Sequence, residues 1–473
     1  MTSATGLLAD YRAGRLSPVA ATRDALARID ELNGTLNGFC LVDADRALAD
    51  AAESAERWRR GEPRGLLDGV PVSVKDLLLT RGWPTLRGSR TIDPGQRWDV
   101  DAPSVARLRE HHAVIIGKTT TPELGWKGVT DNPLTGVTRN PWDPAMTSGG
   151  SSGGAAVAVA AGMGTISLGT DGGGSVRIPA SFSGVFGIKP TYGLVPVFPA
   201  SPFGTLSHVG PLTWTVADAA LALDVLSGVD GRDWSAGPRP AESFAAAVAA
   251  PSVAGMRIAF SPTLGYVSVD PEVAASVASA VQTFAELGAV VSMADPGFAN
   301  PVEAFHVLWF SGAAASTASL SEGQLAGLDP GLREVREQGA RFSALDYLAA
   351  TATRAAVGRT MGEFHERYDL LVTPTMPIPA FAAGVESPAG GRWTGWTPFT
   401  YPFNMTQQPA ATLPCGFTSA GLPVGLQVVG PRHADARVLA ACAAFEQARP
   451  WQATRPPVVT GVTSGSPTRG KLL

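Results

Sequence analysis

The sequence has few of the residues that hold metals or form disulfide bridges. Its 473 residues include only three cysteines, Cys40, Cys415 and Cys442, and six histidines. Three widely spaced cysteines are not a disulfide framework, and neither a C-x-x-C nor an H-E-x-x-H motif occurs. The sequence therefore implies no metal and no cofactor, and it fits a reducing, cytoplasmic environment better than a secreted one.

Charge and long apolar runs are also scarce. Charged residues make up 16% of the chain and the net charge is −4, which offers no basic field for nucleic acid. No run approaches the roughly 18 apolar residues of a membrane helix, and the first residues lack the basic start and apolar core of a signal peptide. We therefore expect a compact cytoplasmic protein that acts on a small molecule, with no nucleic-acid or membrane partner, as a monomer or a homodimer.

Glycine and serine are concentrated in residues 147–179, which read TSGGSSGGAAVAVAAGMGTISLGTDGGGSVRIP. Clusters at 149–154 and 172–175 flank an apolar run at 155–161 that predicts a buried helix, so the first cluster would lie at a helix N-terminus. Free N–H groups there favour an anion, or an oxyanion formed during a reaction. Serines placed among such donors are candidate nucleophiles.

Three general interpretations fit this stretch poorly. A flexible Gly/Ser linker would not interleave the apolar segments AAVAVAAGM and TISLGT. A phosphate cradle would need the Lys-Ser/Thr end of a P-loop or a G-x-G-x-x-G motif, and neither is present in it. Residues 149–153 match the G-x-S-x-G nucleophile elbow, but a strand should precede that motif, and Pro141 and Pro144 oppose one.

The stretch as a whole resembles the signature of the amidase signature family of serine hydrolases, which use a Lys/cis-Ser/Ser triad. The resemblance rests on GGSSGG, on the spacing of 24 between Ser151 and Ser175, and on GGSVRIPA at 173–180. Upstream, GVPVSVKDLL at 69–78 resembles the family's lysine motif. Further similar segments lie at 183–196, 208–213, 370–377 and 421–430, so the resemblance covers most of the chain.

The resemblance implies an α/β fold: a single large α/β/α domain over residues 1–473, with a central mixed, twisted sheet covered by helices on both faces. It implies a signature core at about 65–215, a variable substrate-shaping part at about 230–410 and a C-terminal strand and helix at about 420–450. The Pro/Gly/Ser/Thr-rich composition after Pro450 predicts a flexible tail at 455–473. Residue patterns along the chain fit such a fold. They predict helices at 19–32, 43–60, 103–111, 215–228, 270–287 and 435–449, a mostly helical segment at 301–361, and strands at 70–74, 113–117, 256–261, 289–293, 368–372 and 422–429.

For the reaction, the resemblance implies that Ser175 is the nucleophile, Ser151 the bridging serine after a cis peptide bond from Gly150, and Lys75 the base. A serine hydroxyl is a weak nucleophile until a base takes its proton, and a lysine can be that base where burial keeps it neutral. The proton would pass from Ser175 through Ser151 to Lys75 and return to the leaving amine, and water would resolve an acyl-enzyme on Ser175. His208, near the signature, is an alternative base; a packed, hydrogen-bonded histidine is the other interpretation.

Supporting roles follow from the same resemblance. The oxyanion hole and the substrate wall beside it are expected to involve Gly172, Gly173, Gly174, Ser175, Gly125 and Trp126. Ser152 is expected to hydrogen-bond within its own loop, and Asp171 and Arg177 to brace the loop. Gly172 stands where the family often has a larger residue, which predicts a looser or wider oxyanion loop.

An aromatic loop at 389–408 indicates the substrate class. It has few charges and contains Trp393, Trp396, Phe399, Tyr401 and Phe403. If this loop and Trp126 flank Ser175, they would select an aryl or long-alkyl group on one side of the scissile bond. The opposing interpretation is that these rings only pack the loop onto the core.

The predicted function is therefore hydrolysis of a small hydrophobic or aryl amide, anilide or carbamate. A different function would be that of the amidase subunit in a tRNA-dependent amidotransferase complex, against which the aromatic loop argues because glutamine is polar. The same family also includes carbamate (urethane) hydrolases and nylon-oligomer hydrolases, and either activity is compatible with the motifs, as is a side activity on esters or urethanes. The presence of Lys75, Ser151 and Ser175 argues against a non-catalytic binding module.

Overall fold

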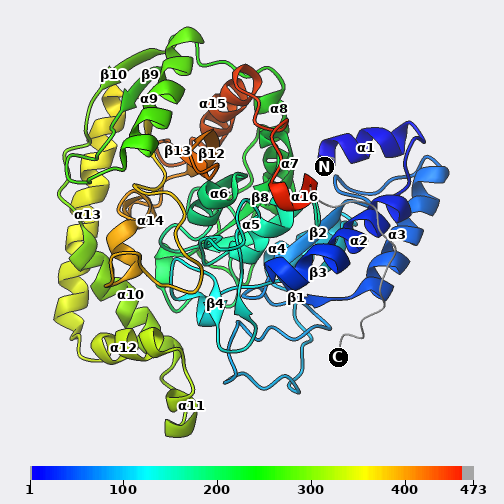
Figure 1. The fold of residues 1–473 in the computed structure, drawn as a ribbon, viewed down its shortest axis with the longest axis horizontal. Coiled ribbons are helices and arrows are strands. Elements are labelled where there is room, and N and C mark those ends of the chain that lie inside the picture. The colour runs from blue at the N-terminus through cyan, green and yellow to red at the C-terminus, as the bar shows by residue number, and fades with distance from the viewer. Residues whose placement is uncertain (1–2, 461–473) are drawn as a thin grey trace.

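The computed structural model describes residues 3–460, and an eleven-stranded sheet runs through them (Figure 1). The strands, in their order across the sheet, are β1 (Phe39–Val42), β3 (Val114–Thr119), β2 (Pro71–Lys75), β6 (Ile166–Asp171), β8 (His208–Thr213), β7 (Phe186–Lys189), β12 (Ala410–Phe417), β13 (Pro423–Val429), β11 (Leu370–Pro374), β9 (Arg257–Phe260) and β10 (Val290–Met293). The pairs β2–β3, β2–β6, β9–β10 and β9–β11 are parallel and the others are antiparallel. The sheet is therefore mixed, as predicted.

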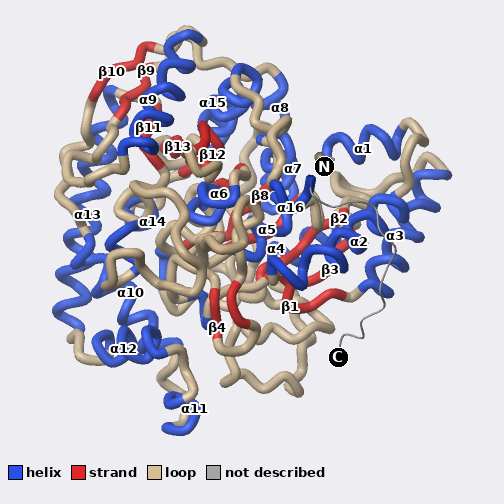
Figure 2. Tube along the Cα trace, viewed as in Figure 1, coloured by secondary structure: helices blue, strands red, loops and turns tan. Residues whose placement is uncertain are grey.

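Helices connect the strands and surround the sheet (Figure 2). They are α1 (Ala4–Arg12), α2 (Pro18–Leu36), α3 (Ala44–Arg59), α4 (Pro103–Glu110), α5 (Gly153–Ala160), α6 (Arg177–Ser183), α7 (Val216–Leu226), α8 (Phe244–Ala249), α9 (Pro271–Glu286), α10 (Val302–Ser316), α11 (Glu322–Ala326), α12 (Pro330–Gly339), α13 (Ala344–Arg367), α14 (Tyr401–Met405), α15 (Asp435–Ala448) and α16 (Pro457–Thr460). Within the described residues, no helix combines the length and apolar character that crossing a membrane requires.

The two faces of the sheet are covered by different helices, as the packing of β11 shows. Leu370 and Val372 join a core cluster with side chains of α9 and α15, whereas Leu371 joins a cluster with side chains of α13. Successive side chains of a strand point to opposite faces, so helices cover both faces. The predicted α/β fold with a helix-covered mixed sheet is confirmed.

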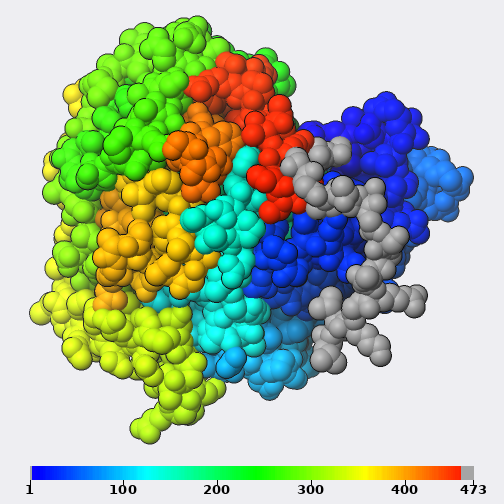
Figure 3. All heavy atoms as spheres, in the orientation of Figure 1, coloured from blue at the N-terminus to red at the C-terminus, as the bar shows by residue number. Residues whose placement is uncertain are grey.

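On the face shown in Figure 3, the N-terminal part of the chain (blue) and the segment from α10 to α13 (yellow-green) lie on opposite flanks. The cyan segment that contains β4 (Asp131–Asn132) lies between them. The segment that precedes the signature thus separates the N-terminal part of the chain from the segment α10 to α13 on this face.

Most predicted helices and strands are present, with shifted ends. The clearest error is the end of α2, which was expected at Asn33-Gly34 and lies at Leu36. Asn37, with a φ of 50°, takes the left-handed C-terminal position instead. The Asn33 side chain accepts hydrogen bonds from the amides of Gly38 and Phe39, so it stabilises the turn beyond the helix from a position inside it.

The sheet topology brings distant parts of the signature together. Strands β2 and β6 are adjacent and parallel, so their carboxyl ends lie at the same edge of the sheet. Lys75 is the last residue of β2, and Asp171 ends β6 directly before the second glycine cluster. Helix α5 begins at Gly153, immediately after Ser151 and Ser152. This edge is where a site built from these segments must form.

Candidate active site

The side chain of Lys75 is fully buried and surrounded by hydroxyl groups. Its Nζ lies 2.7 Å from Ser151 Oγ, 2.9 Å from Ser152 Oγ and 2.9 Å from Thr170 Oγ1. Burial holds the pKa of Lys75 well below its ordinary value, and the charge of Asp171 opposes only part of that effect. A neutral amine in this position can accept a proton from a serine hydroxyl.

Ser151 follows a cis peptide bond from Gly150, as the resemblance implied. The residue before this bond and the first residue of α5 must both be glycines, because a side chain at either position would collide with its neighbours. A Cβ on Gly150 would come within 2.5 Å of the Val129 carbonyl group, and one on Gly153 would come within 2.3 Å of Thr130 Oγ1. The first glycine cluster is therefore required by close packing, and it fixes Ser151 beside Lys75.

The second glycine cluster forms a loop that carries Ser175, and only some backbone amides of this loop are hydrogen-bonded within the protein. The Gly174 amide donates to Asp171 Oδ1 over 2.8 Å. Within residues 3–460, the amides of Gly172, Gly173 and Ser175 have no protein acceptor. These three can donate to an oxyanion, whereas the share expected of Gly174 is corrected, because its N–H is already bonded to a carboxylate.

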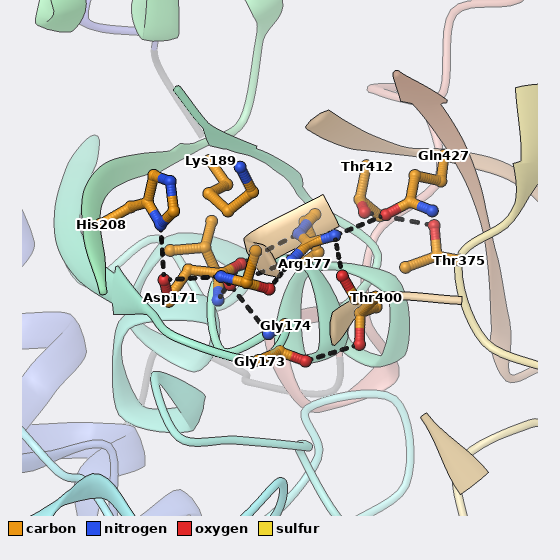
Figure 4. Close-up of polar contacts among 12 residues, drawn as sticks. Asp171, Gly173, Gly174, Arg177, Lys189, His208, Thr375, Thr400, Thr412 and Gln427 are labelled. Carbon is orange, nitrogen blue, oxygen red and sulfur yellow. Dashed lines mark hydrogen bonds and ion pairs between the residues drawn. The ribbon is translucent and has the colours of Figure 1, made fainter. Parts of the chain in front are cut away.

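A buried ion pair supports this loop from behind (Figure 4). Arg177 donates to both carboxylate oxygens of Asp171 at 3.0 Å, and both side chains are fully buried. Arg177 also donates to the Thr400 carbonyl oxygen, to Gln427 Oε1 and to Asn404 Oδ1. Burial opposes ionisation of Asp171, yet the charge and hydrogen bonds of Arg177 hold the pKa of Asp171 below its ordinary value. The loop thus rests on a charged, fully hydrogen-bonded pair.

Thr400 adds a second support to the glycine loop. Its Oγ1 donates to the Gly173 carbonyl oxygen over 2.7 Å. A Cβ on Gly174, which has a φ of +130°, would come within 2.4 Å of the same hydroxyl oxygen. Gly174 is therefore required both by its backbone conformation and by the approach of Thr400.

Ser152 differs from its predicted role. Its hydroxyl contacts Lys75 and bonds the backbone of Thr170 on β6, donating to the carbonyl oxygen over 3.1 Å and accepting from the amide over 3.2 Å. It therefore joins the loop to the neighbouring strand and does not bond within its own loop. Thr170, which the sequence interpretation missed, completes the polar surroundings of Lys75.

His208 has a structural environment. Its Nδ1 lies 2.8 Å from the Leu206 carbonyl oxygen and 3.2 Å from that of Asp171, and burial lowers the pKa of its imidazole. In the part of the chain that the structure describes, no hydrogen bond joins His208 to Ser151 or Ser175. The packed, hydrogen-bonded interpretation of this histidine fits this environment, and the role of base does not.

Ser151 and Ser175 open onto a cavity of about 290 Å³. Gly125, Thr170 and Gly172 lie beside them in its lining. The apolar wall is formed by Leu77, Leu124, Val197, Phe198, Phe203, Val209 and Trp309. The site is thus a small pocket with a polar floor and a largely apolar and aromatic wall.

The aromatic residues expected in that wall lie behind it. Trp126 is fully buried outside the lining, and its carbonyl oxygen accepts a hydrogen bond of 3.0 Å from Trp309 Nε1. Trp393 packs against Gly173, where an added Cβ would come within 2.8 Å of its ring. None of the five aromatic residues predicted from loop 389–408 lines the cavity. Trp393, Trp396 and Tyr401 pack in the cluster behind the wall, whereas Phe399 and Phe403 pack in the core cluster with α13. The rings exposed to the cavity come from α10 and from residues 197–203.

The described residues hold no group of three or more His, Cys, Asp or Glu side chains arranged to bind a metal. The chemistry available at this edge of the sheet consists of a buried amine, the hydroxyls of Ser151 and Ser175, and three free amides. A neutral amine can take the proton of a serine hydroxyl, and free amides can stabilise an oxyanion, so these are groups of the kind that acyl transfer to a serine requires.

Comparison with known proteins assigns the family. The family described as Amidase matches residues 20–439, so the chain belongs to the amidase signature family and is an amidase, a hydrolase of C–N bonds. An acylamidase from Rhodococcus erythropolis is 40% identical over 464 residues, which cover 96% of this chain and 97% of that protein. A glutamyl-tRNA(Gln) amidotransferase subunit from Chloroflexus aggregans is 34% identical, over 94% of this chain and 96% of that protein.

A solved structure is similar over nearly the whole chain. A bacterial aryl acylamidase of the amidase signature enzymes superimposes with a TM-score of 0.91 at 32% identity, covering 98% of this chain and 99% of that one. The similarity to this solved structure therefore indicates the same family as the sequence comparison does.

Proposed function

We propose that this amidase hydrolyses small aryl or hydrophobic amides through an acyl-enzyme on Ser175, with Ser151 and neutral Lys75 as the proton relay. The observation that carries the proposal is the 2.7 Å contact between Lys75 Nζ and Ser151 Oγ at the floor of a cavity that Ser175 also lines. The similarity to an acylamidase and to an aryl acylamidase supports the same substrate class.

The first half of the reaction transfers the acyl group to the enzyme. Lys75 takes the proton of Ser151 as Ser151 takes that of Ser175, and Ser175 Oγ attacks the amide carbonyl carbon. The amides of Gly173 and Ser175 donate to the oxyanion that forms. The proton then returns through Ser151 to the leaving nitrogen, the C–N bond breaks, and the amine departs.

The second half releases the acid. Water enters the place of the amine and gives a proton to the same relay as it attacks the acyl-enzyme carbonyl carbon. The tetrahedral intermediate collapses, Ser175 recovers its proton, and the carboxylic acid leaves. Each proton taken by Lys75 is returned, so the relay ends each cycle as it began.

The shape and polarity of the cavity support an aryl or alkyl substrate. Phe198, Phe203 and Trp309 offer aromatic surface, and Leu77 and Leu124 offer aliphatic surface. Burying the apolar groups of a substrate against such a wall favours binding, whereas acetamide has only one methyl group to bury. Anilides, aryl carbamates and hydrophobic amides are therefore the proposed substrates.

The similarity to a glutamyl-tRNA(Gln) amidotransferase subunit makes glutamine hydrolysis a second candidate function. Free glutamine carries an ammonium group, and no Asp or Glu lies in the lining of the cavity, as the described residues define it, to pair with that group. This argues for a stand-alone amidase. Size-exclusion chromatography of the protein alone and with amidotransferase partner subunits would reveal a complex if one forms.

A substrate panel tests the proposal. Purified protein is assayed on acetanilide, hydrophobic primary amides, an aryl carbamate, an aryl ester, a nylon-type oligoamide, acetamide and glutamine. We expect the highest kcat/KM among the anilides, aryl carbamates and hydrophobic amides. Ser175→Ala should remove turnover and labelling by a fluorophosphonate probe, whereas Ser316→Ala, at another cavity serine, should retain both. A higher kcat/KM on acetamide or glutamine, or labelling of the Ser175→Ala protein, would contradict the proposal.

A further inference from the structure

The cavity that contains Ser175 holds one charged side chain among the described residues, that of Arg87. Arg87 is half-buried, and no hydrogen bond or ion pair of its guanidinium with any residue in 3–460 is found. Burial lowers the pKa of the Arg87 guanidinium. Because arginine has the highest ordinary pKa of any side chain, the group still stays charged at neutral pH. A cation without a partner thus lies in the wall of an otherwise uncharged pocket.

Asp76 attracts Arg87 electrostatically, but no hydrogen bond or ion pair joins its carboxylate to the guanidinium within the described residues. Asp76 Oδ1 lies 2.8 Å from Lys118 Nζ, and the backbone of Arg87 and Gly88 helps to stabilise the charged form of the same carboxylate. The carbonyl oxygen of Arg87 accepts a further hydrogen bond of 2.8 Å from the Leu124 amide. These contacts fix the Arg87 backbone, which has a φ of 54°, and leave the guanidinium available.

Such an arrangement is unfavourable unless something pairs with the guanidinium. Taking a charge partly out of water costs free energy that a counter-charge or hydrogen-bond acceptor recovers. Asp76, directly after Lys75, holds Arg87 on the loop that follows β2, so the cation is fixed relative to the proton relay. A substrate bound over Ser175 shares its cavity with this group.

We propose that Arg87 is a specificity-determining residue that pairs with a carboxylate on the substrate, so that the preferred substrates are aryl or alkyl amides bearing a carboxylate away from the scissile bond. The inference rests on the proposed function, because it concerns the substrate of the same site. Arginine suits this role because its planar group can donate two parallel hydrogen bonds to one carboxylate. The apolar wall binds the ring or chain, and Arg87 binds the charge.

Two matched substrate pairs test the inference on either side of the scissile bond. On the amine side, para-acetamidobenzoate is compared with para-isopropylacetanilide; on the acyl side, succinanilate is compared with isocaproanilide. In each pair an isopropyl group replaces a carboxylate of the same shape. We expect at least one pair to favour the carboxylate in kcat/KM, and Arg87→Met to reduce that preference roughly 10- to 100-fold, the range of a charge-assisted hydrogen bond.

Three further variants make the result specific. Arg87→Lys should retain part of the preference. Arg87→Asn provides a second neutral side chain that tolerates the positive φ, in case Arg87→Met folds poorly. Arg90→Met removes an exposed arginine outside the cavity lining and should leave both substrate ratios unchanged. The inference is wrong if neither pair favours the carboxylate in the unmodified protein, or if the preference survives in both neutral variants.

A binding measurement separates this inference from the proposed reaction. Calorimetric titration of the Ser175→Ala protein with para-acetamidobenzoate and succinanilate needs no turnover. Weaker binding in Ser175→Ala/Arg87→Met supports the carboxylate contact. This holds even if no anilide is hydrolysed, a result that would contradict the proposed function but not the inference. Equal binding with and without Arg87 would overturn the inference while leaving amide hydrolysis intact.

Discussion

Gly172 lies directly against the indole of Trp309: a Cβ added at Gly172 would come within 2.8 Å of Trp309 Cζ3. The missing side chain does not widen the oxyanion loop, as the sequence had suggested, because the ring of Trp309 fills the space. The ring stacks on Phe203 with centroids 3.9 Å apart. The glycine and the tryptophan together set the width of the cavity beside Ser175.

Gly172→Ala should therefore damage the site by displacing Trp309. Forcing a methyl group into a packed contact costs about 1–3 kcal/mol, so we expect kcat/KM on acetanilide to fall about tenfold or more. Gly395→Ala is the matched control, since a Cβ there meets no atom within 4 Å. The double variant Gly172→Ala/Trp309→Leu should recover part of the loss on a hydrophobic alkyl amide, which does not depend on the aromatic ring. Unchanged kinetics in Gly172→Ala would show that the contact is not needed.

The sequence identified the parts of the site that lie in local motifs. Ser151 and Ser175 occur in one glycine-rich stretch, and Lys75 lies at a strand end that resembles a family motif, so their meeting at one site could be predicted without a structure. Trp309 could not be inferred, because it comes from an apolar helix far along the chain, where an inward-facing ring looks like any core residue. The same applies to Asn404, whose contacts with Asp171 join residues more than 200 positions apart.

Five strands were missed from the sequence, and two of them are buried along their whole length. Five strands of the sheet have no counterpart among the predicted ones: β1, β6, β7, β8 and β12. All residues of β7 and β8 are buried, so neither shows the alternation of polar and apolar residues by which a half-exposed strand is recognised. The overall α/β class was still predictable, from the family resemblance and from the alternation of predicted helices and strands elsewhere in the chain.

The pH dependence of activity should follow Lys75. The relay needs neutral Lys75, and burial lowers the pKa of this group, so activity should be high above the lowered pKa and fall as the pH drops through it. The measurement is kcat/KM on an anilide over a pH series. Lys75→Ala should lose amide cleavage more severely than ester cleavage, since an amine leaving group needs the returned proton. Equal losses on a matched anilide and aryl ester would contradict the proton-return role.

The same group should affect stability with a defined sign. Between the ordinary pKa of a lysine and the lowered pKa of Lys75, the unfolded chain binds a proton that the folded chain does not, so unfolding becomes easier as the pH falls. Within this window, each unit by which the pH falls should lower the free energy of unfolding of the unmodified protein by about 1.4 kcal/mol. The Lys75→Met protein should not show this loss. Urea unfolding of both proteins at pH 7, 8 and 9 measures the difference. A difference that does not change with pH would mean that folded Lys75 is protonated.

Arg177→Met should destabilise the protein strongly, because Asp171 would remain buried without its partner. Breaking a buried pair on one side costs about 3–5 kcal/mol, measurable by urea unfolding, and activity should fall with it because Asp171 holds the Gly174 amide. Asp171→Asn/Arg177→Met should recover part of the stability, since no unpaired charge remains. A loss below about 1 kcal/mol in Arg177→Met would show that the pair is not important for stability.

Selection of an aryl group should depend on the rings that line the cavity, Phe198, Phe203 and Trp309, and not on the rings behind them. Trp309→Ala removes one of the three rings that line the cavity, and we expect the kcat/KM ratio of acetanilide to a hydrophobic alkyl amide to fall by up to about tenfold, because one aromatic contact contributes about 0.5–1.5 kcal/mol. Trp126→Phe should leave that ratio within about twofold, because Trp126 contacts Trp309 through a backbone carbonyl oxygen, which the substitution retains. Trp396→Phe serves as a second control, since its indole nitrogen donates to the Glu386 carbonyl oxygen away from the cavity. If Trp126→Phe shifts the ratio as much as Trp309→Ala does, selection depends on the packing of the whole cluster and not on the ring exposed to the substrate.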